Sequence, residues 1–137
     1  MKNVVLIFFI LIVVTGCNNT ARQLRQTISG ADSIAINYYK GDGKMDTVTA
    51  VKIVRDKKLI DDISALMTES SVSAQNKCGY DGSIHFFKND KVIQDVFFNS
   101  STEDCRMFVF ALKGKDVATG LDDKAKEFLS AQNNNKN

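Results

Sequence analysis

The chain has 137 residues, of which 44% are hydrophobic, and this size and composition predict one folded domain rather than a disordered chain. Its 18 Lys and Arg side chains nearly balance its 16 Asp and Glu side chains, and the two signs are interspersed along the sequence. Such a balance gives no basic patch of the kind that attracts nucleic acid, so we expect no nucleic-acid partner.

The first sixteen residues contain the three parts of a secretory signal peptide. Lys2 gives a positive start, an unbroken apolar run follows over residues 4–14, and the small residue Gly16 precedes Cys17. A helix that crosses a bilayer needs about 20 apolar residues, so this run is too short to span. We therefore predict a signal peptide over residues 1–16 that is removed on export.

The residues around this cleavage site, Val14-Thr15-Gly16-Cys17, resemble the lipobox of bacterial lipoproteins. The resemblance implies cleavage between Gly16 and Cys17, attachment of diacylglycerol and a palmitate-type acyl chain to Cys17, and a lipid bilayer as partner. Two or more acyl chains give stable anchoring to a membrane. Asn18 stands where an aspartate retains lipoproteins at the inner membrane, which favours the outer membrane of the cell envelope. The alternative is a plain signal peptide followed by an incidental cysteine.

Both ends of the remaining chain are polar. Residues 17–31 are predicted to form the lipidated cysteine and a flexible tether, in which Leu24 and Ile28 permit a short helical turn but no strong apolar face. The asparagine-rich residues 132–137 are predicted to form a disordered tail. A single folded domain is therefore expected over residues 32–131.

The first part of this domain is predicted to form two strands and a helix. Residues 33–39 alternate with a period of two, which indicates a strand. Residues 47–54 are rich in β-branched side chains and form the expected returning strand after a turn at 41–44. Apolar residues then recur at helical spacing over 57–68, with Asp56 as the candidate N-cap.

A hairpin is predicted next, over residues 83–98. Asn89-Asp90 is a two-residue turn signal between two β-rich runs. A loop of this length pairs Phe87 with Val92 and Phe86 with Ile93. We expect the core face of the hairpin to carry Ile84, Phe86, Ile93 and Phe97, and the opposite face to carry His85, Phe87, Val92, Val96 and Phe98.

The last elements are a strand and a helix. Residues 105–112 supply another apolar strand, which the polar residues 113–116 are expected to end. Apolar residues from Leu121 to Leu129 fall on one helical face, with Asp122 or Thr119 as the candidate cap. This order of elements predicts an α+β fold, with a mostly antiparallel sheet of about five strands and two helices on one face.

Three cysteines in an exported chain leave one without a partner, unless Cys17 carries lipid. Cys78 and Cys105 then remain, at neighbouring ends of the predicted strands, and we expect them to form a structural disulfide in an oxidising compartment. The alternatives are a free nucleophilic Cys105 or a metal site.

The sequence predicts no catalytic or metal-binding group. His85 is the one histidine, and a Cys–His pair would need it beside a reduced cysteine and a third group that orients the ring. Zinc binding by Cys78, Cys105 and His85 lacks the close paired spacing of known sites. We therefore expect no metal and no other cofactor.

Several aromatic side chains exceed what a sheet with one buried face requires. They form a candidate partner surface, unless a core that wraps both faces of the sheet covers them. The members are Tyr38, Tyr39, Tyr80, Phe87 and Phe98.

The run Cys78-Gly79-Tyr80-Asp81-Gly82, the hairpin that follows, Cys105 and the final helix resemble small lipoproteins of Bacteroidetes over residues 32–131. This resemblance implies an envelope location and carries no activity over to any residue. We therefore expect a membrane-anchored lipoprotein that binds an envelope protein or another periplasmic component and is not an enzyme. The alternative is a small thiol- or histidine-dependent envelope enzyme.

Overall fold

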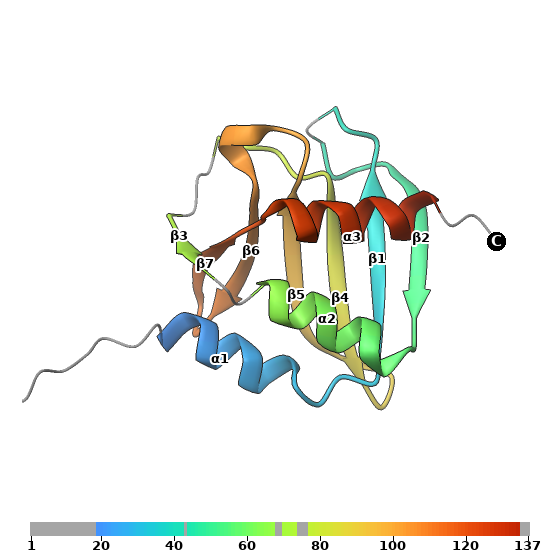
Figure 1. Cartoon of the computed structure of the whole chain (residues 1–137), viewed down its shortest axis with the longest axis vertical. Helices are drawn as coiled ribbons and strands as arrows, with labels where there is room; N and C mark the ends of the chain where they lie inside the picture. The colour runs from blue at the N-terminus through green and yellow to red at the C-terminus, as the bar shows by residue number, and fades with distance from the viewer. Residues whose placement is uncertain (1–18, 43, 68–69, 74–76, 135–137) are drawn as a thin grey trace, which may run out of the picture.

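The computed structural model describes residues 19–42, 44–67, 70–73 and 77–134, so the predicted signal peptide and Cys17 lie outside the described residues. Within them the chain forms an α+β domain in which a seven-stranded antiparallel sheet carries all three helices on one side (Figure 1). The helices are α1 (Asn19–Ile28), α2 (Lys57–Met67) and α3 (Asp123–Asn134), with a 3-10 turn, η1 (Glu103–Cys105). The strands are β1 (Ser33–Tyr39), β2 (Val48–Val54), β3 (Ser71–Val72), β4 (Gly82–Lys88), β5 (Lys91–Asn99), β6 (Met107–Leu112) and β7 (Lys115–Gly120).

The strands lie in the order β2-β1-β4-β5-β6-β7-β3, and every pairing is antiparallel. The predicted α+β class and the antiparallel sheet are therefore confirmed. The described part of the chain has two more strands and one more helix than the sequence predicts, namely β3, β7 and α1.

The flexible tether predicted over residues 17–31 is wrong from Asn19 onward, because α1 is a helix that packs on the sheet. Leu24 and Ile28 are buried at 0% and 1% exposure, and Ala21 and Ala31 are buried beside them. Three apolar residues at i, i+3 and i+7 suffice for one narrow buried stripe when a sheet covers it. The folded domain therefore begins thirteen residues earlier than predicted, at Asn19 instead of residue 32.

The strand ends at Leu112 as predicted, but residues 115–116 do not belong to the break, because a two-residue turn at 113–114 leads directly into β7. Lys113 and Gly114 both have positive φ, 52° and 75°, which is the backbone twist of a tight hairpin. Glycine adopts this conformation freely, whereas lysine does so only where the surrounding pairing imposes it. The register Leu112–Lys115 closes the turn.

The Asn89-Asp90 hairpin is confirmed, with φ of 50° and 61° at the two turn residues. Its predicted core face is partly wrong, since the register shifts after Phe87–Val92 and leaves Ile93 as an extra residue. A continuous register would set Asp95 opposite Ile84, under the helices, where a carboxylate is costly to bury. The bulge turns Asp95 outward and brings Val96 and Phe98 into the core in place of Phe97, while Ile93 stays partly buried against the core.

The core lies between the sheet and the helical layer. Ile84, Phe86 and Phe98 contribute from the central strands, and each is exposed by 1% or less. The helices close this layer with Leu24, Ile28, Ile60, Ile63, Met67, Ala125 and Leu129.

The predicted cap of α2 is confirmed, and of the two candidates for α3 the structure has Asp122. The Asp56 carboxylate accepts hydrogen bonds from the backbone N–H of Lys58 and of Leu59 at 2.8 and 3.2 Å. The Asp122 carboxylate accepts one from Ala125 at 2.8 Å. The predicted tail over residues 132–137 is wrong for residues 132–134, because α3 continues to Asn134 and Gln132 is buried, and residues 135–137 lie outside the described residues.

Candidate functional site on the open face of the sheet

One face of the sheet carries no helix among the described residues (Figure 1). Side chains alternate along each strand, so every second residue points to this side, which we call the open face. Its central residues are Ala35, Asn37 and Tyr39 of β1, Ser83, His85 and Phe87 of β4, and Asp95 and Phe97 of β5. Met107, Val109 and Ala111 of β6 and Asp116 and Ala118 of β7 continue it.

A chain of polar side chains runs across the centre of the open face. His85 Nδ1 lies 2.6 Å from Asp95 Oδ1, and His85 Nε2 lies 3.0 Å from both Ser83 Oγ and Asn37 Nδ2. The Tyr39 hydroxyl donates to Ser83 Oγ at 3.0 Å. Asn37 and Ser83 are register partners across β1 and β4. His85 and Asp95 are register partners across β4 and β5, so backbone pairing brings the four polar groups together.

The partners of His85 are compatible with a ring proton on Nδ1. A carboxylate only accepts hydrogen bonds and an amide nitrogen only donates them. With the proton on Nδ1, the ring donates to Asp95 while Nε2 accepts from Asn37. This arrangement satisfies both contacts and fixes the imidazole and one oxygen of Asp95 in place.

Ser83, His85 and Asp95 have the contact distances of a serine hydrolase triad but not its accessibility. Ser83 is 0% exposed, and its oxygen is already engaged by the Tyr39 hydroxyl and the His85 ring. A substrate carbonyl must come within about 3–3.5 Å of an attacking oxygen. The covered hydroxyl leaves no room for that approach, and the chain orients His85 and Asp95 instead.

A cavity of about 420 Å³ opens on the same face beside Asp95. It lies where β5 and β6 separate, because their register pairing ends at Val96–Phe110. Tyr80 and Phe97 form an aromatic wall, with ring centroids 5.1 Å apart. The cavity therefore joins an aromatic surface to the carboxylate that His85 orients.

The other sides of the cavity come from the two strands beyond β5. Val109 and Ala111 of β6 give an apolar floor, and Asp116 of β7 adds a second carboxylate. The pKa of the Tyr80 phenol is raised, first by burial and second by the negative charge of Asp116. The ring of Tyr80 therefore lies within the field of the Asp116 carboxylate.

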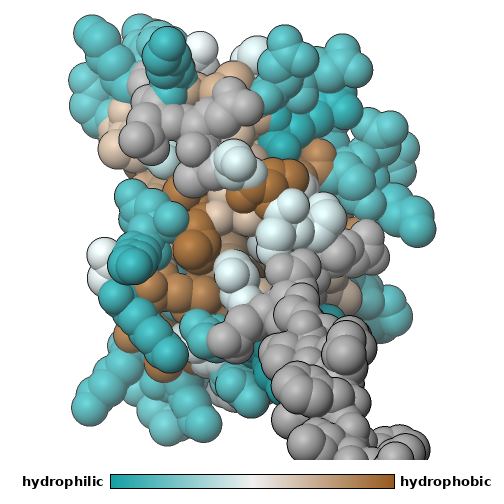
Figure 2. Space-filling model, turned by 90° about the vertical axis from the view of Figure 1, so that its left-hand side faces the viewer, coloured by the Kyte–Doolittle hydropathy of each residue, from teal (hydrophilic) through white to brown (hydrophobic). Residues whose placement is uncertain are grey.

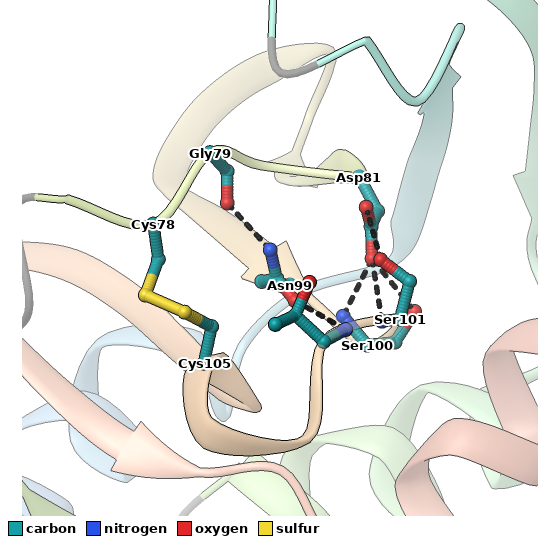
Figure 3. Close-up of a disulfide and its surroundings, with 8 residues drawn as sticks. Cys78, Gly79, Asp81, Asn99, Ser100, Ser101 and Cys105 are labelled. Atoms are coloured by element: carbon teal, nitrogen blue, oxygen red, sulfur yellow. Dashed lines mark hydrogen bonds between the residues drawn. A yellow bond between two sulfur atoms is a disulfide. The ribbon is translucent and has the colours of Figure 1, made fainter.

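A disulfide holds the segment that carries Tyr80. Cys78 and Cys105 are bonded to each other, with Cα atoms 5.8 Å apart, so the predicted disulfide is confirmed (Figure 3). Both cysteines and Tyr80 pack on a small apolar cluster of Met107, Val109 and Ala118 on the open face. The disulfide therefore fixes one wall of the cavity.

Hydrogen bonds fix the other end of the same segment (Figure 3). The Asp81 carboxylate accepts from the backbone N–H of Ser100 and of Ser101 at 2.7 and 2.8 Å, and from both hydroxyls at 3.2 and 2.9 Å. Asn99 Nδ2 donates to the Gly79 carbonyl oxygen at 2.7 Å. Tyr80 is thus held between two anchored residues.

The structure divides the predicted aromatic surface. Tyr38 and Phe98 do not belong to it, because they are 7% and 1% exposed and lie in the core beneath α3. Tyr39, Tyr80 and Phe87 are half-buried on the open face. The bulge at Ile93 is the reason for the error at Phe98, since it reverses the faces of all later residues of β5.

The alternative prediction of a nucleophilic Cys105 requires a free thiol. In this structure the sulfur atoms of Cys78 and Cys105 are bonded to each other, so neither residue carries one. Among the described residues, no group of three or more metal-ligating side chains lies close enough together to hold a metal ion.

The sequence did not predict the chain of polar side chains around His85 or the place of Phe97 in the cavity wall. The sequence does carry a signal for the polar chain. Asn37, Ser83 and Asp95 are polar residues within three apolar strands, and they fall on the same face of the sheet once the bulge is known.

Apolar side chains are also exposed at the two edges of the sheet. On β2 these are Val48, Val51 and Ile53. The opposite side, seen in Figure 2, is the β7–β3 edge, where apolar side chains gather in the middle and hydrophilic ones surround them. Val72 of β3 is exposed there.

Comparison with known protein families, with curated proteins and with solved structures found no match to this chain. Among the helices of the described residues, none is long and apolar enough to cross a membrane. The lipobox Val14-Thr15-Gly16-Cys17 lies outside the described residues.

Proposed function

We propose that this protein is a lipid-anchored lipoprotein of the cell envelope that binds a ligand on its open face and is not an enzyme. The observation that carries the binding role is the cavity of about 420 Å³ on a sheet face that no described helix covers. Ligand sites are typically apolar cavities of about 300–1,000 Å³ with a few placed polar groups. The aromatic wall and the oriented Asp95 carboxylate fit that pattern.

The signal peptide and the lipobox at Cys17 support the anchor, and the disulfide is consistent with an oxidising compartment. Because α1 begins at Asn19, the link between the lipid and the folded domain is very short. Only Asn18 separates Cys17 from the first helical residue, Asn19, and two residues span at most about 7 Å. A lipid on Cys17 would therefore hold the domain directly against the bilayer, with the amino-terminal end of α1 facing the headgroups.

A histidine-dependent enzyme is the second candidate, and the contact between Ser83 and His85 is the observation that favours it. The complete burial of Ser83 stands against it. Hydrolysis of small acyl esters that is lost in Ser83→Ala, while the variant stays folded, would favour the enzyme over the binding protein.

The binding role is tested by NMR on isotope-labelled protein purified from cells that express the full-length chain. Envelope extract is separated by size into small molecules and macromolecules, and each fraction is added to the protein. We expect one fraction to shift amide signals of the open face, around Tyr80 and Phe97, and to leave α2 and α3 unchanged. Shifts confined to the helical side, or none from either fraction, would contradict the proposal.

A further inference from the structure

The cavity on the open face combines apolar walls with two carboxylates. Phe97 and Val109 supply apolar surface, and the carboxylates of Asp95 and Asp116 supply the charge. No lysine or arginine lines the cavity within the described part of the chain. Along this described lining, an entering group thus meets two carboxylates and no lysine or arginine.

The hydrogen bonds of the two carboxylates leave acceptor capacity for a ligand. Asp95 Oδ1 accepts from His85 Nδ1, which fixes the orientation of the carboxylate. Among the described residues, nothing donates a hydrogen bond to Asp95 Oδ2 or to the Asp116 carboxylate. The pKa of Tyr80 is raised first by burial and second by the charge of Asp116, and the second cause agrees with a negative field at the cavity.

Apolar walls together with two carboxylates favour a ligand of positive charge. An anionic ligand would be repelled by both carboxylates, and a neutral ligand would gain nothing from their charge. A metal ion in the cavity would find two carboxylates but no third ligating side chain among the described residues. A positively charged group gains from the carboxylates and from the faces of the aromatic rings together.

We propose that the cavity binds an organic ammonium ion on a short apolar stem, with its charge at Asp95 and Asp116 and its stem against Phe97 and Val109. The inference rests on the proposed function of the open face and names the chemical class of its ligand. Free amines and the lysine side chains of peptides share this chemistry, so the probes must separate the two sources.

The test is an NMR titration of the purified protein with matched small probes. Phenethylammonium is the cation, 2-phenylethanol is its neutral counterpart, and phenylacetate is the anion. We expect the cation to shift the amide signals of Tyr80, Phe97 and Val109 and to bind at least about tenfold more tightly than the alcohol. Its affinity should fall as ionic strength rises, since the site is partly open to solvent.

Charge-removing variants test the two carboxylates separately. Asp116→Asn and Asp95→Asn should each weaken phenethylammonium about fivefold. Asp95→Asn keeps an acceptor for His85, so it removes the charge and preserves the hydrogen bond. Asp61→Asn, on α2 and behind the sheet, is the matched control and should leave the affinity unchanged.

A lysine peptide identifies the source of the cation. Acetyl-Gly-Lys-Gly-amide is compared with the same peptide acetylated on the lysine Nζ. Binding of the peptide in its charged form alone points to a polypeptide ligand, and binding of phenethylammonium alone points to a free amine. Either result supports the ammonium site.

Equal affinity for phenethylammonium and 2-phenylethanol, preference for phenylacetate, or no shift at Tyr80 and Phe97 with any cation would overturn the inference. Those results leave the proposed function intact if an envelope fraction still shifts signals of the open face. Failure of both the probes and the fractions would remove the binding role itself.

Discussion

The hydroxyl of Tyr38 donates a hydrogen bond of 2.7 Å to the backbone carbonyl oxygen of Leu129, and it joins the sheet to α3 inside the core. The ring packs edge-on against Phe98, with centroids 6.0 Å apart. Tyrosine is tolerated in a core when its hydroxyl finds such a partner. The burial raises the pKa of the Tyr38 phenol well above its usual value, because the phenolate would lose its hydration.

Tyr38→Phe should lower the free energy of unfolding by about 1 kcal/mol at neutral pH, since one buried hydrogen bond is lost. It should also change the alkaline behaviour. The raised pKa of Tyr38 means that its contribution is complete below about pH 10, the ordinary tyrosine value, and is lost as pH rises beyond it. Urea unfolding between pH 7 and pH 11 should show a smaller alkaline loss in the variant. Identical losses in both proteins would contradict this role.

Leu24→Ala should destabilise the domain by about 3 kcal/mol, because a fully buried leucine leaves a cavity between α1 and the sheet. Gln26→Ala, on the exposed side of the same helix, is the control and should change stability by less than about 0.5 kcal/mol. Denaturant unfolding measures both. Equal stabilities would mean that α1 is a loose tether after all.

Asp81→Ala should cost about 3 kcal/mol, because four donors of Ser100 and Ser101 lose one charged acceptor. Asp81→Asn keeps one acceptor oxygen and should cost less. The loss should be visible as faster hydrogen exchange at the two serine amides. Unchanged exchange in the alanine variant would show that the loop is held by other contacts.

Removal of the disulfide by Cys78→Ser with Cys105→Ser should lower the free energy of unfolding by about 3.5 kcal/mol in the chain-entropy model, for a sequence separation of 27 residues. It should also loosen the wall that Tyr80 forms, so phenethylammonium should bind more weakly to the folded variant. Thermal unfolding and the NMR titration measure the two effects. Two free thiols in the oxidised wild-type protein would refute the pairing.

Local signals predicted much of the fold. The Asn89-Asp90 turn and the caps Asp56 and Asp122 follow from the chemistry of single residues, and the structure confirms them. β7 was missed because Lys113 adopts positive φ, a conformation that the sequence alone does not favour for lysine. α1 was missed because its buried stripe is narrow, and the sheet rather than the helix's own composition stabilises it.

The candidate site was predicted less completely. Tyr80 was expected on a partner surface, but Phe97 was expected in the core. One extra residue at Ile93 decides the outcome, since it sends Phe97 and Asp95 to the open face together. The position of such a bulge depends on which register of β5 against its two neighbouring strands buries the fewest charged side chains. The registers can be compared only when the neighbouring strands are known, and the sequence alone does not give them.

Mass spectrometry of the amino-terminal tryptic peptide, from protein purified out of the membrane fraction, tests the lipid anchor most directly. We predict a peptide of residues 17–22 that begins at Cys17 and carries the mass of a diacylglyceryl group and a further acyl chain. Cys17→Ala should abolish this peptide and release the domain from the membrane fraction. An unmodified Cys17, or a peptide that retains residues of the leader, would contradict the anchored lipoprotein.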